Sequence, residues 1–202
     1  DFEKQRNPIT EGIQGNRNVV SEDRTISDNF DEIKVQQGIQ LFITQDNATE
    51  IKIEADENII DLLITEVKDN QLKIYFEKNV NRAKARNVFL STAVIKKIKA
   101  SSGASVKSEN TFQVTSLDLD ASSGSSIKVY VNADDITTET SSGANIKVYG
   151  KSKSFSAKAR NVSLLPAVNV TTPDALVVPT NCRLIVYCVS LAPELLVVNS
   201  VL

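Results

Sequence analysis

SSGSSIKVY at residues 122–130 is followed 19 residues later by SSGANIKVY at residues 141–149, and a shorter copy, SSGASVK, begins at Ser101. The Ser-Ser-Gly triplets thus begin at positions 101, 122 and 141, with spacings of 21 and 19 residues. A fixed period of about 20 residues indicates a repeat architecture, in which each unit packs mainly against its neighbours.

Short alternating segments flank each triplet. SLDLDA at 116–121 alternates apolar and acidic residues, and SIKVYV at 126–131 alternates again. Period two is typical of half-buried strands. The repeat is too short for two helices, so we predict an all-β fold: a β-solenoid with right-handed parallel β-helix-like coils of about 20 residues. The alternative is a sandwich with Gly-Ser hairpins, but the recurrence of IKVY at one offset from the glycine favours the solenoid.

The triplets are predicted to form structural turns between strands. Glycine adopts a positive φ at a corner, where we expect a Cβ to clash. Small serines fit the bend, and their hydroxyls can bond the local backbone or the serine of the next coil. The nine turn residues are Ser101, Ser102, Gly103, Ser122, Ser123, Gly124, Ser141, Ser142 and Gly143.

The chain before the repeats also alternates. FDEIKVQQGIQLFITQ at 30–45 predicts two strand runs, with Gly38 as a bulge or bend between them. ENIIDLLITEV at 57–67 fits a short helix better than a strand. The predicted divisions are a flexible polar leader at 1–28, an N-terminal β part at 29–84, the Ser-Ser-Gly repeats at 85–159, and divergent apolar C-terminal strands at 160–202.

The pattern breaks after residue 159. A further triplet is expected near residue 160, but the chain has Arg160-Asn161-Val162, and no glycine follows. One interpretation is a set of genuine buried strands. The other is a frameshifted copy of further coils. With the frame moved back by one nucleotide, the codons for 175–180 permit Ser-Ser-Gly-Ala-Asn or Ser-Ser-Gly-Ala-Asp and those for 194–198 permit Ala-Ser-Gly-Gly, about one repeat apart. Sequencing of the coding DNA distinguishes the two.

Composition excludes several classes of function. The chain has no histidine, which excludes a Ser-His-Asp triad and histidine metal ligation. Its net charge of -2 gives no basic surplus for nucleic acid, and no apolar run is long enough to predict a transmembrane segment. The two cysteines, Cys182 and Cys188, could form one small disulfide, but the sequence does not say whether they are bonded.

The sequence resembles the head GIN domain family. The resemblance is carried by RTISDNFDEIKVQQGIQLFITQ at 24–45, by IKIEADENIIDLLITEVKDNQLKIY at 51–75, and by the repeated SSGAS and SSGAN. It covers about residues 24–159. It implies an all-β fold with a β-helical part in an exported, adhesin-type protein, often a lipoprotein. The implied location is periplasmic, outer-membrane-anchored or at the cell surface. No catalytic residues come with the resemblance.

Four residues of the repeats are candidates for ligand binding. Lys128 and Lys147, and likewise Tyr130 and Tyr149, recur at the same offset from the triplet glycines. We expect a lysine row and a tyrosine row on the outer face, forming a shallow strip for an anionic polymer, a glycan or a surface protein. The alternative is that amphipathic stacking alone produces these rows.

Two acidic groups suggest other chemistry. Asp118 and Asp120 lie on one strand face roughly 7 Å apart, a separation that suits glycoside hydrolysis, although a solvated face also explains them. Asp134, Asp135 and Glu139 could offer oxygens to Ca²⁺, but no calcium-loop motif surrounds them.

We therefore predict an exported binding protein that is not an enzyme and uses no cofactor or metal. The alternatives are a polysaccharide lyase or hydrolase on a β-helix scaffold, and a purely structural envelope module. The sequence gives no indication of the ligand's identity or of the oligomeric state.

Overall fold

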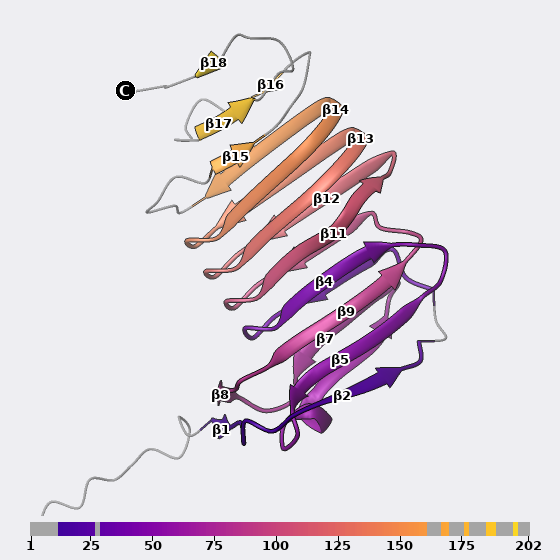
Figure 1. Cartoon of the computed structure of the whole chain (residues 1–202). Coiled ribbons are helices and arrows are strands. Elements are labelled where there is room, and N and C mark those ends of the chain that lie inside the picture. Colours follow the sequence, from indigo (N-terminus) through magenta and orange to yellow (C-terminus); the bar gives the residue numbers. More distant parts are fainter. Residues whose placement is uncertain are drawn as a thin grey trace, which may run out of the picture.

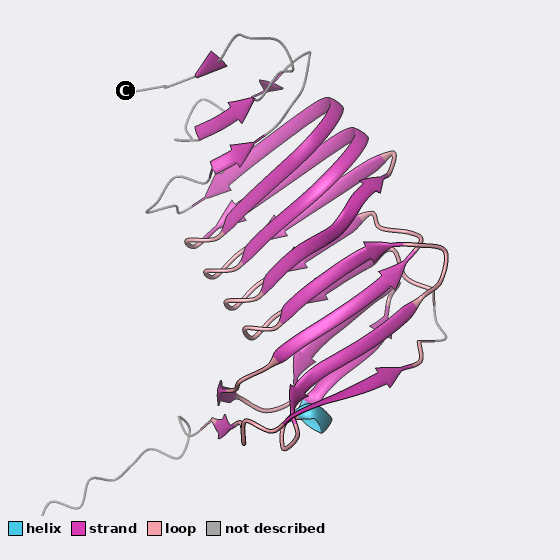
Figure 2. Ribbon diagram, in the orientation of Figure 1, coloured by secondary structure: helices cyan, strands magenta, loops and turns pink. Residues whose placement is uncertain are grey.

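The computed structural model describes residues 12–26, 29–160, 167–169, 176–177, 185–188 and 196–197. Strands dominate these residues (Figure 2), and the helical element among them is the short 3-10 helix η2, Ile60–Leu62. The predicted all-β fold is confirmed. None of the described residues belongs to a helix of the length and apolarity that a bilayer crossing requires.

The strands follow one another along the chain with short connections. In order they are β1 (Ile13–Gln14), β2 (Val19–Arg24), β3 (Glu32–Val35), β4 (Gln40–Gln45), β5 (Glu50–Asp56), β6 (Leu63–Lys68), β7 (Gln71–Phe76), β8 (Val80–Arg82), β9 (Arg86–Thr92), β10 (Lys97–Ala100), β11 (Ser105–Gln113), β12 (Ser116–Ala121), β13 (Ser126–Ser141), β14 (Asn145–Arg160), β15 (Ala167–Asn169), β16 (Leu176–Val177), β17 (Ile185–Cys188) and β18 (Leu196–Val197).

The main sheet is curled into two limbs that face each other. The first limb contains β9, β4, β11 and the leading halves of β13 and β14, and the second contains β7, β3, β10, β12 and the trailing halves. Neighbouring strands within each limb are parallel, and β13 pairs with β14 in register from Ser126 to Ser141. Figure 1 shows these strands stacked along the length of the molecule.

The sheet is mixed, so a wholly parallel β-helix does not describe it. At the N-terminal end of the stack, β5 pairs antiparallel with both β9 and β2, and β6 pairs antiparallel with β7. The β6–β7 reversal uses Asp69 and Asn70, which both have positive φ. A two-residue hairpin of this kind can join only antiparallel strands.

The core lies between the two limbs. Every second side chain of a strand points inward, and in-register pairing aligns these side chains into apolar rows. One row is Leu41, Val106, Ile127 and Ile146, none of which is more than 1% exposed. A single strand pair cannot enclose such a row, so the stack as a whole provides the hydrophobic stabilisation.

The predicted helix at 57–67 is wrong except for a single turn. Only Ile60–Leu62 is helical, and Leu63 already begins β6. Short apolar runs do not distinguish a buried strand from a buried helix. The strand forms because β7 supplies backbone hydrogen-bond partners along Leu63–Lys68.

The Ser-Ser-Gly triplets all adopt the same backbone. In each, the second serine and the glycine have positive φ: 53° and 75° at Ser102 and Gly103, 52° and 71° at Ser123 and Gly124, and 51° and 74° at Ser142 and Gly143. The Ala104 amide closes the first turn by donating to the Ser101 carbonyl over 3.1 Å. Two consecutive left-handed residues with this closing bond define a type I′ turn.

A fourth turn of the same kind precedes the repeats. Gln37 and Gly38 have φ of 61° and 70°, so Gly38 belongs to a turn equivalent to the triplets. Its amide donates to the Ser102 carbonyl over 3.0 Å. The same bond runs from Gly103 to Ser123 and from Gly124 to Ser142, each over 3.0 Å. The turns therefore form a ladder along one edge of the stack, visible in Figure 2.

The expected Cβ clash at the turn glycines is wrong. A Cβ placed on Gly103, Gly124 or Gly143 meets no atom within 4 Å, so only the backbone conformation favours glycine there. Hydroxyl bonding occurs just after the second triplet. The Ser125 hydroxyl donates to the Ala100 carbonyl over 2.8 Å and accepts from the Ser122 amide over 3.0 Å.

Some predictions fall largely outside the described residues. They are the divergent strands and frameshift at 160–202, the pairing of Cys182 with Cys188, and residues 1–11 and 27–28 of the predicted flexible leader. Residues 12–26 of that leader are described and contain β1 and β2, and β2 pairs antiparallel with β5. In the described backbone beyond β14, strand β16 pairs in parallel with β14. Parallel pairing also crosses the predicted division at residue 84, because β4 pairs with both β9 and β11.

Candidate functional site

The four predicted binding residues lie on the outer face of the first limb. Lys128 and Tyr130 alternate with buried Ile127 and Val129, so both point away from the core. Pairing of β13 with β14 places Lys128 beside Lys147 and Tyr130 beside Tyr149. The two rows expected from the sequence are therefore adjacent in space.

The tyrosines form a stack that a lysine covers. The ring centroids of Tyr130 and Tyr149 are 4.9 Å apart, with 22° between the planes. The Lys128 ammonium lies 5.6 Å from the Tyr130 centroid and 5.5 Å from the Tyr149 centroid, within cation–π range of both. These contacts hold Lys128 in a defined position.

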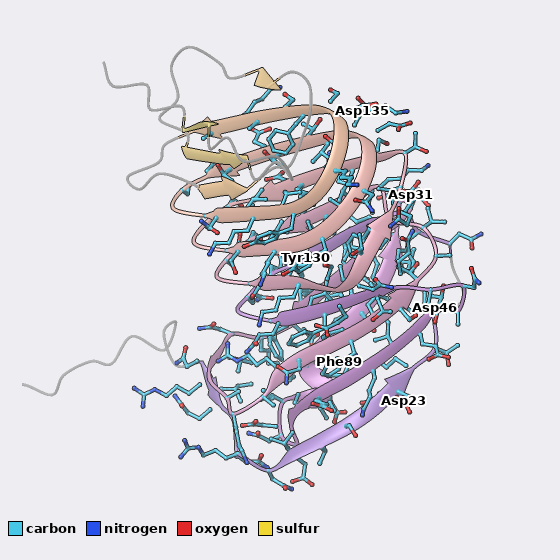
Figure 3. The ribbon with its side chains drawn as sticks, turned by 45° about the horizontal axis from the view of Figure 1, so that its top comes forward. Asp23, Asp31, Asp46, Phe89, Tyr130 and Asp135 are labelled. Atoms are coloured by element: carbon cyan, nitrogen blue, oxygen red, sulfur yellow. The ribbon has the colours of Figure 1, made fainter. Side chains whose placement is uncertain are left out.

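The structure extends this surface to three residues that the sequence analysis missed. Lys107 of β11 pairs with Lys128 on one side and with Phe42 on the other, and Phe42 pairs with Phe89 of β9. The two phenylalanine rings stack with centroids 5.0 Å apart, and the Lys107 ammonium lies 5.5 Å from the Phe42 centroid. In Figure 3, Tyr130 lies above Phe89 along the stack.

We call this surface the aromatic–lysine strip. It consists of Phe42, Phe89, Lys107, Lys128, Tyr130, Lys147 and Tyr149. A sequence signal existed for Phe42 and Lys107, because each lies four residues after its turn glycine, as do Lys128 and Lys147. Phe89 has no such signal, since only strand pairing brings β9 beside β4.

The rings of the strip stand on edge. Side chains on adjacent strands that stack face to face have their ring normals along the stack of strands. One face of each ring therefore contacts the neighbouring ring, and the ring edges and tyrosine hydroxyls are left for a ligand. Aromatic edges carry partial positive charge, so edges and ammonium groups together favour an anion.

The lysines of the strip have no acidic partner among the residues that the structure describes. Within the described part of the chain, Lys107, Lys128 and Lys147 make no ion pair. The outer face of the second limb is different, since Lys97 pairs with Asp118 at 3.7 Å and Lys99 pairs with Glu32 at 3.4 Å. The first limb thus presents positive charge that is open to an external partner.

A hollow lies at the phenylalanine end of the strip. Its volume is about 610 Å³, and its lining includes Phe42, Phe89, Asp23, Glu50, Lys52 and Glu109. Arg24 also borders the hollow, but its guanidinium bonds the Ile60 carbonyl at 3.0 Å and pairs with Glu22 at 3.1 Å. The mixed charge here contrasts with the lysine row above it.

The other acidic candidates do not converge on a site. Asp118 pairs with Lys97, and its side chain is 52% exposed, as expected for a solvated strand face. Asp134 accepts a 2.7 Å bond from Lys153, and this bond and its charge raise the pKa of that lysine. Across the described residues, no group of three or more His, Cys, Asp or Glu side chains could hold a metal ion.

One buried carboxylate has a structural role that the sequence analysis missed. Asp56 is fully buried at the end of β5 and accepts backbone N–H groups from Arg17, Lys84 and Ala85 at 2.9 to 3.1 Å. Burial raises the pKa of Asp56, but these donors and the Lys84 charge outweigh burial, so the pKa lies below its ordinary value. The carboxylate ties together three segments at the base of the stack.

Comparison with known families agrees with this fold. The family described as "Putative auto-transporter adhesin, head GIN domain" matches residues 29–178. This chain belongs to the head GIN domain family. The resemblance drawn from the sequence is therefore confirmed. No curated protein sequence matches the chain.

Solved structures share the fold of this head GIN domain. A "putative adhesin" from Bacteroides fragilis NCTC 9343 has a TM-score of 0.66 at 17% identity, over 80% of each chain. A "putative adhesin" from Parabacteroides distasonis ATCC 8503 has a TM-score of 0.58 at 21% identity, over 80% of this chain and 82% of that one. A "putative lipid binding protein" from the same organism has a TM-score of 0.59 at 16% identity, over 79% and 82%. At these identities the likeness shows the fold alone.

Proposed function

We propose that this head GIN domain is an exported, non-catalytic binding module of adhesin type, which holds a surface ligand on the aromatic–lysine strip. The observation that carries the proposal is the row of three lysines, which make no ion pair with any other described residue, beside stacked aromatic rings. Family membership supports an adhesin-type role in the periplasm, on an outer-membrane anchor or at the cell surface.

The proposed architecture is a β-solenoid of right-handed, β-helix-like coils over 85–159, preceded by the N-terminal β part at 29–84. In-register parallel pairing through β10, β12, β13 and β14 supports it, as does the ladder of equivalent turns. The proposed divisions also include the leader at 1–28 and the divergent C-terminal segment at 160–202. A stack of this kind presents a long, rigid surface, which suits adhesion.

The electrostatics of the strip support a ligand-binding role. Like charges directly opposite each other on neighbouring strands destabilise a sheet. The chain nevertheless places Lys107, Lys128 and Lys147 side by side. A negatively charged ligand would offset this repulsion, whereas a purely structural module would gain nothing from it.

The test is a binding panel of neutral and acidic polysaccharides and extracellular-matrix proteins, with product release measured in parallel. The variant is Tyr130→Ala/Tyr149→Ala. The matched control is Tyr75→Ala, an outward tyrosine of the second limb whose hydroxyl bonds Glu66 at 3.2 Å. We expect saturable binding without turnover, lost in the double variant and kept in the control. Product formation, or binding that both variants weaken equally, would contradict the proposal.

A further inference from the structure

We infer that the ligand of the strip is a linear acidic polysaccharide with a carboxylate on every sugar residue, lying across the strands along the stack. This inference rests on the proposed function and names the class of ligand. Three features of the strip carry it: the spacing of the cations, the absence of internal partners for them, and the polar rows on either side.

The spacing of the lysines sets the spacing of the charges that they fit. Lys107, Lys128 and Lys147 occupy equivalent positions on three successive, in-register strands. Strands in a sheet lie about 4.8 Å apart, so the Cα atoms of these lysines repeat at about that distance, and their long side chains can reach charges spaced in the same way. This spacing is close to the length of one pyranose residue in an extended chain. A polymer with a carboxylate on every residue therefore offers the lysines twice as many partners over the same length as one charged on alternate residues.

The cations are available and partly ordered. None of the three has an ion-pair partner among the residues described, so a ligand carboxylate need not displace an internal one. Lys128 is held over the two tyrosine rings, and Lys107 over Phe42. Side chains that are already ordered lose less conformational entropy on binding.

The residues on either side of the lysine row offer hydrogen-bonding groups, which suit a ligand with sugar hydroxyls better than a polyanion without them. On one side lies an in-register row of Ser105, Ser126 and Asn145, in which the two serine hydroxyls are 3.2 Å apart. On the other side lie Tyr130 and Tyr149, which stack on each other through one face of each ring and carry phenolic hydroxyls. Hydroxyl and amide groups of these two rows can bond sugar hydroxyls.

The second limb supplies an internal comparison. Lys73, Lys34 and Lys99 also lie in register on three neighbouring strands. Here acidic residues interrupt the positive charge, because Lys99 pairs with Glu32 and is followed in its row by Asp120. Glu66 also lies opposite Lys73. The number and spacing of the lysines are the same, but the carboxylates are already present, so we expect no binding at this row.

The experiment measures binding of the full chain to polygalacturonate, to its methyl ester, and to hyaluronan, which carries a carboxylate on alternate sugars. The variants are Lys107→Gln/Lys128→Gln/Lys147→Gln and, as the matched control, Lys34→Gln/Lys73→Gln/Lys99→Gln. Each triple variant changes the net charge by the same amount. The single variant Lys128→Gln keeps the test valid should a triple variant fail to fold.

We expect the order polygalacturonate, then hyaluronan, then the methyl ester, from tightest to weakest. An exposed ion pair contributes about 1.4- to 5-fold in affinity, so the strip triple variant should weaken polygalacturonate binding by roughly 3- to 100-fold. The single variant should weaken it by roughly 1.4- to 5-fold. The control triple variant should bind like the unchanged chain.

Other outcomes would overturn the inference. Equal binding of the methyl ester would show that the strip does not recognise carboxylates. Equal or tighter binding of hyaluronan would show that a carboxylate on every sugar residue gives no advantage. An equal loss in the control triple variant shows attraction by overall charge. Binding of a different panel polysaccharide that depends on Tyr130 and Tyr149, without binding of polygalacturonate, leaves the proposed function standing and refutes this inference alone.

Discussion

At the scale of single residues, two glycines meet different constraints. Gly124 in the second triplet has φ of 71° and open space where a Cβ would be. Gly150 has φ of 137°, and a Cβ there would lie 1.8 Å from the Val131 carbonyl oxygen. Conformation alone therefore requires glycine at the turn, whereas conformation and contact both require it in β14.

This difference predicts unequal costs for the same substitution. Gly124→Ala should lower the free energy of unfolding by about 1 to 2 kcal/mol, the cost of a left-handed non-glycine residue. Gly150→Ala should cost more, roughly 3 kcal/mol or above, because β13 and β14 must separate. Denaturant unfolding of both variants measures the difference. Equal costs would show that the close approach at Gly150 relaxes freely.

Asp56 makes stability depend on pH. Asp56→Asn should lower the free energy of unfolding at neutral pH by about 1 to 3 kcal/mol, because buried backbone donors lose charged acceptors. The folded pKa lies below the ordinary value of 3.8, so the carboxylate stabilises the fold above that value. This contribution is lost as the pH falls through the lowered folded pKa.

The advantage of the unchanged chain over Asp56→Asn should therefore shrink on acidification below about pH 4. Denaturant unfolding at a series of pH values measures it. Asp61→Asn, which alters an exposed carboxylate, is the control and should change stability by no more than about 0.5 kcal/mol. A constant difference at all pH values would contradict the account.

At the scale of elements, the repeats could be predicted because their turn and strand signals agree. Ser-Ser-Gly marks a turn, and IKVY marks a half-buried strand at a fixed offset. Gly38 was predicted as a bulge or bend, but its equivalence to the triplet turns was not predicted, because QQG shares only its glycine with the triplets. Residues 57–67 were misassigned because their apolar run fits either structure, and pairing with β7 decides between them.

The candidate site was predictable only where the repeat itself carries it. Lys128, Tyr130, Lys147 and Tyr149 follow from the repeated IKVY. The contact between Phe42 and Phe89 depends on the pairing of β4 with β9, which no repeat in the sequence signals. Strand pairing of this kind is a property of the whole stack, so single-sequence reasoning could not find this end of the strip.

The repulsion within the lysine row should lower the thermal stability of the free protein. Lys147→Gln removes a like charge beside Lys128, so we expect a small rise in the midpoint of thermal unfolding, on the order of 1 °C, at low salt. Lys128→Gln relieves more repulsion but loses two cation–π contacts, so its midpoint should stay nearly unchanged. The rise in the midpoint for Lys147→Gln should disappear near 1 M salt, because charges are then screened within about 3 Å. A fall in the midpoint for Lys147→Gln would refute this balance.

At the scale of the whole molecule, the curled sheet separates two outer faces. The second limb carries lysines and acids that pair with one another, and the first carries the strip. The net charge of the chain is -2, so the positive strip is a local feature of a slightly acidic molecule. Local charge of this kind favours a specific orientation of an anionic partner over general attraction.

An NMR titration shows most directly whether the first limb is the binding face. Backbone amide shifts of the isotope-labelled chain are followed on addition of each panel ligand that binds, starting with polygalacturonate. We expect shift changes centred on Lys107, Lys128, Tyr130, Lys147 and Tyr149, with little change on the outward residues of β7, β3, β10 and β12. Changes centred on the second limb, or no shift change with any ligand, would contradict this expectation.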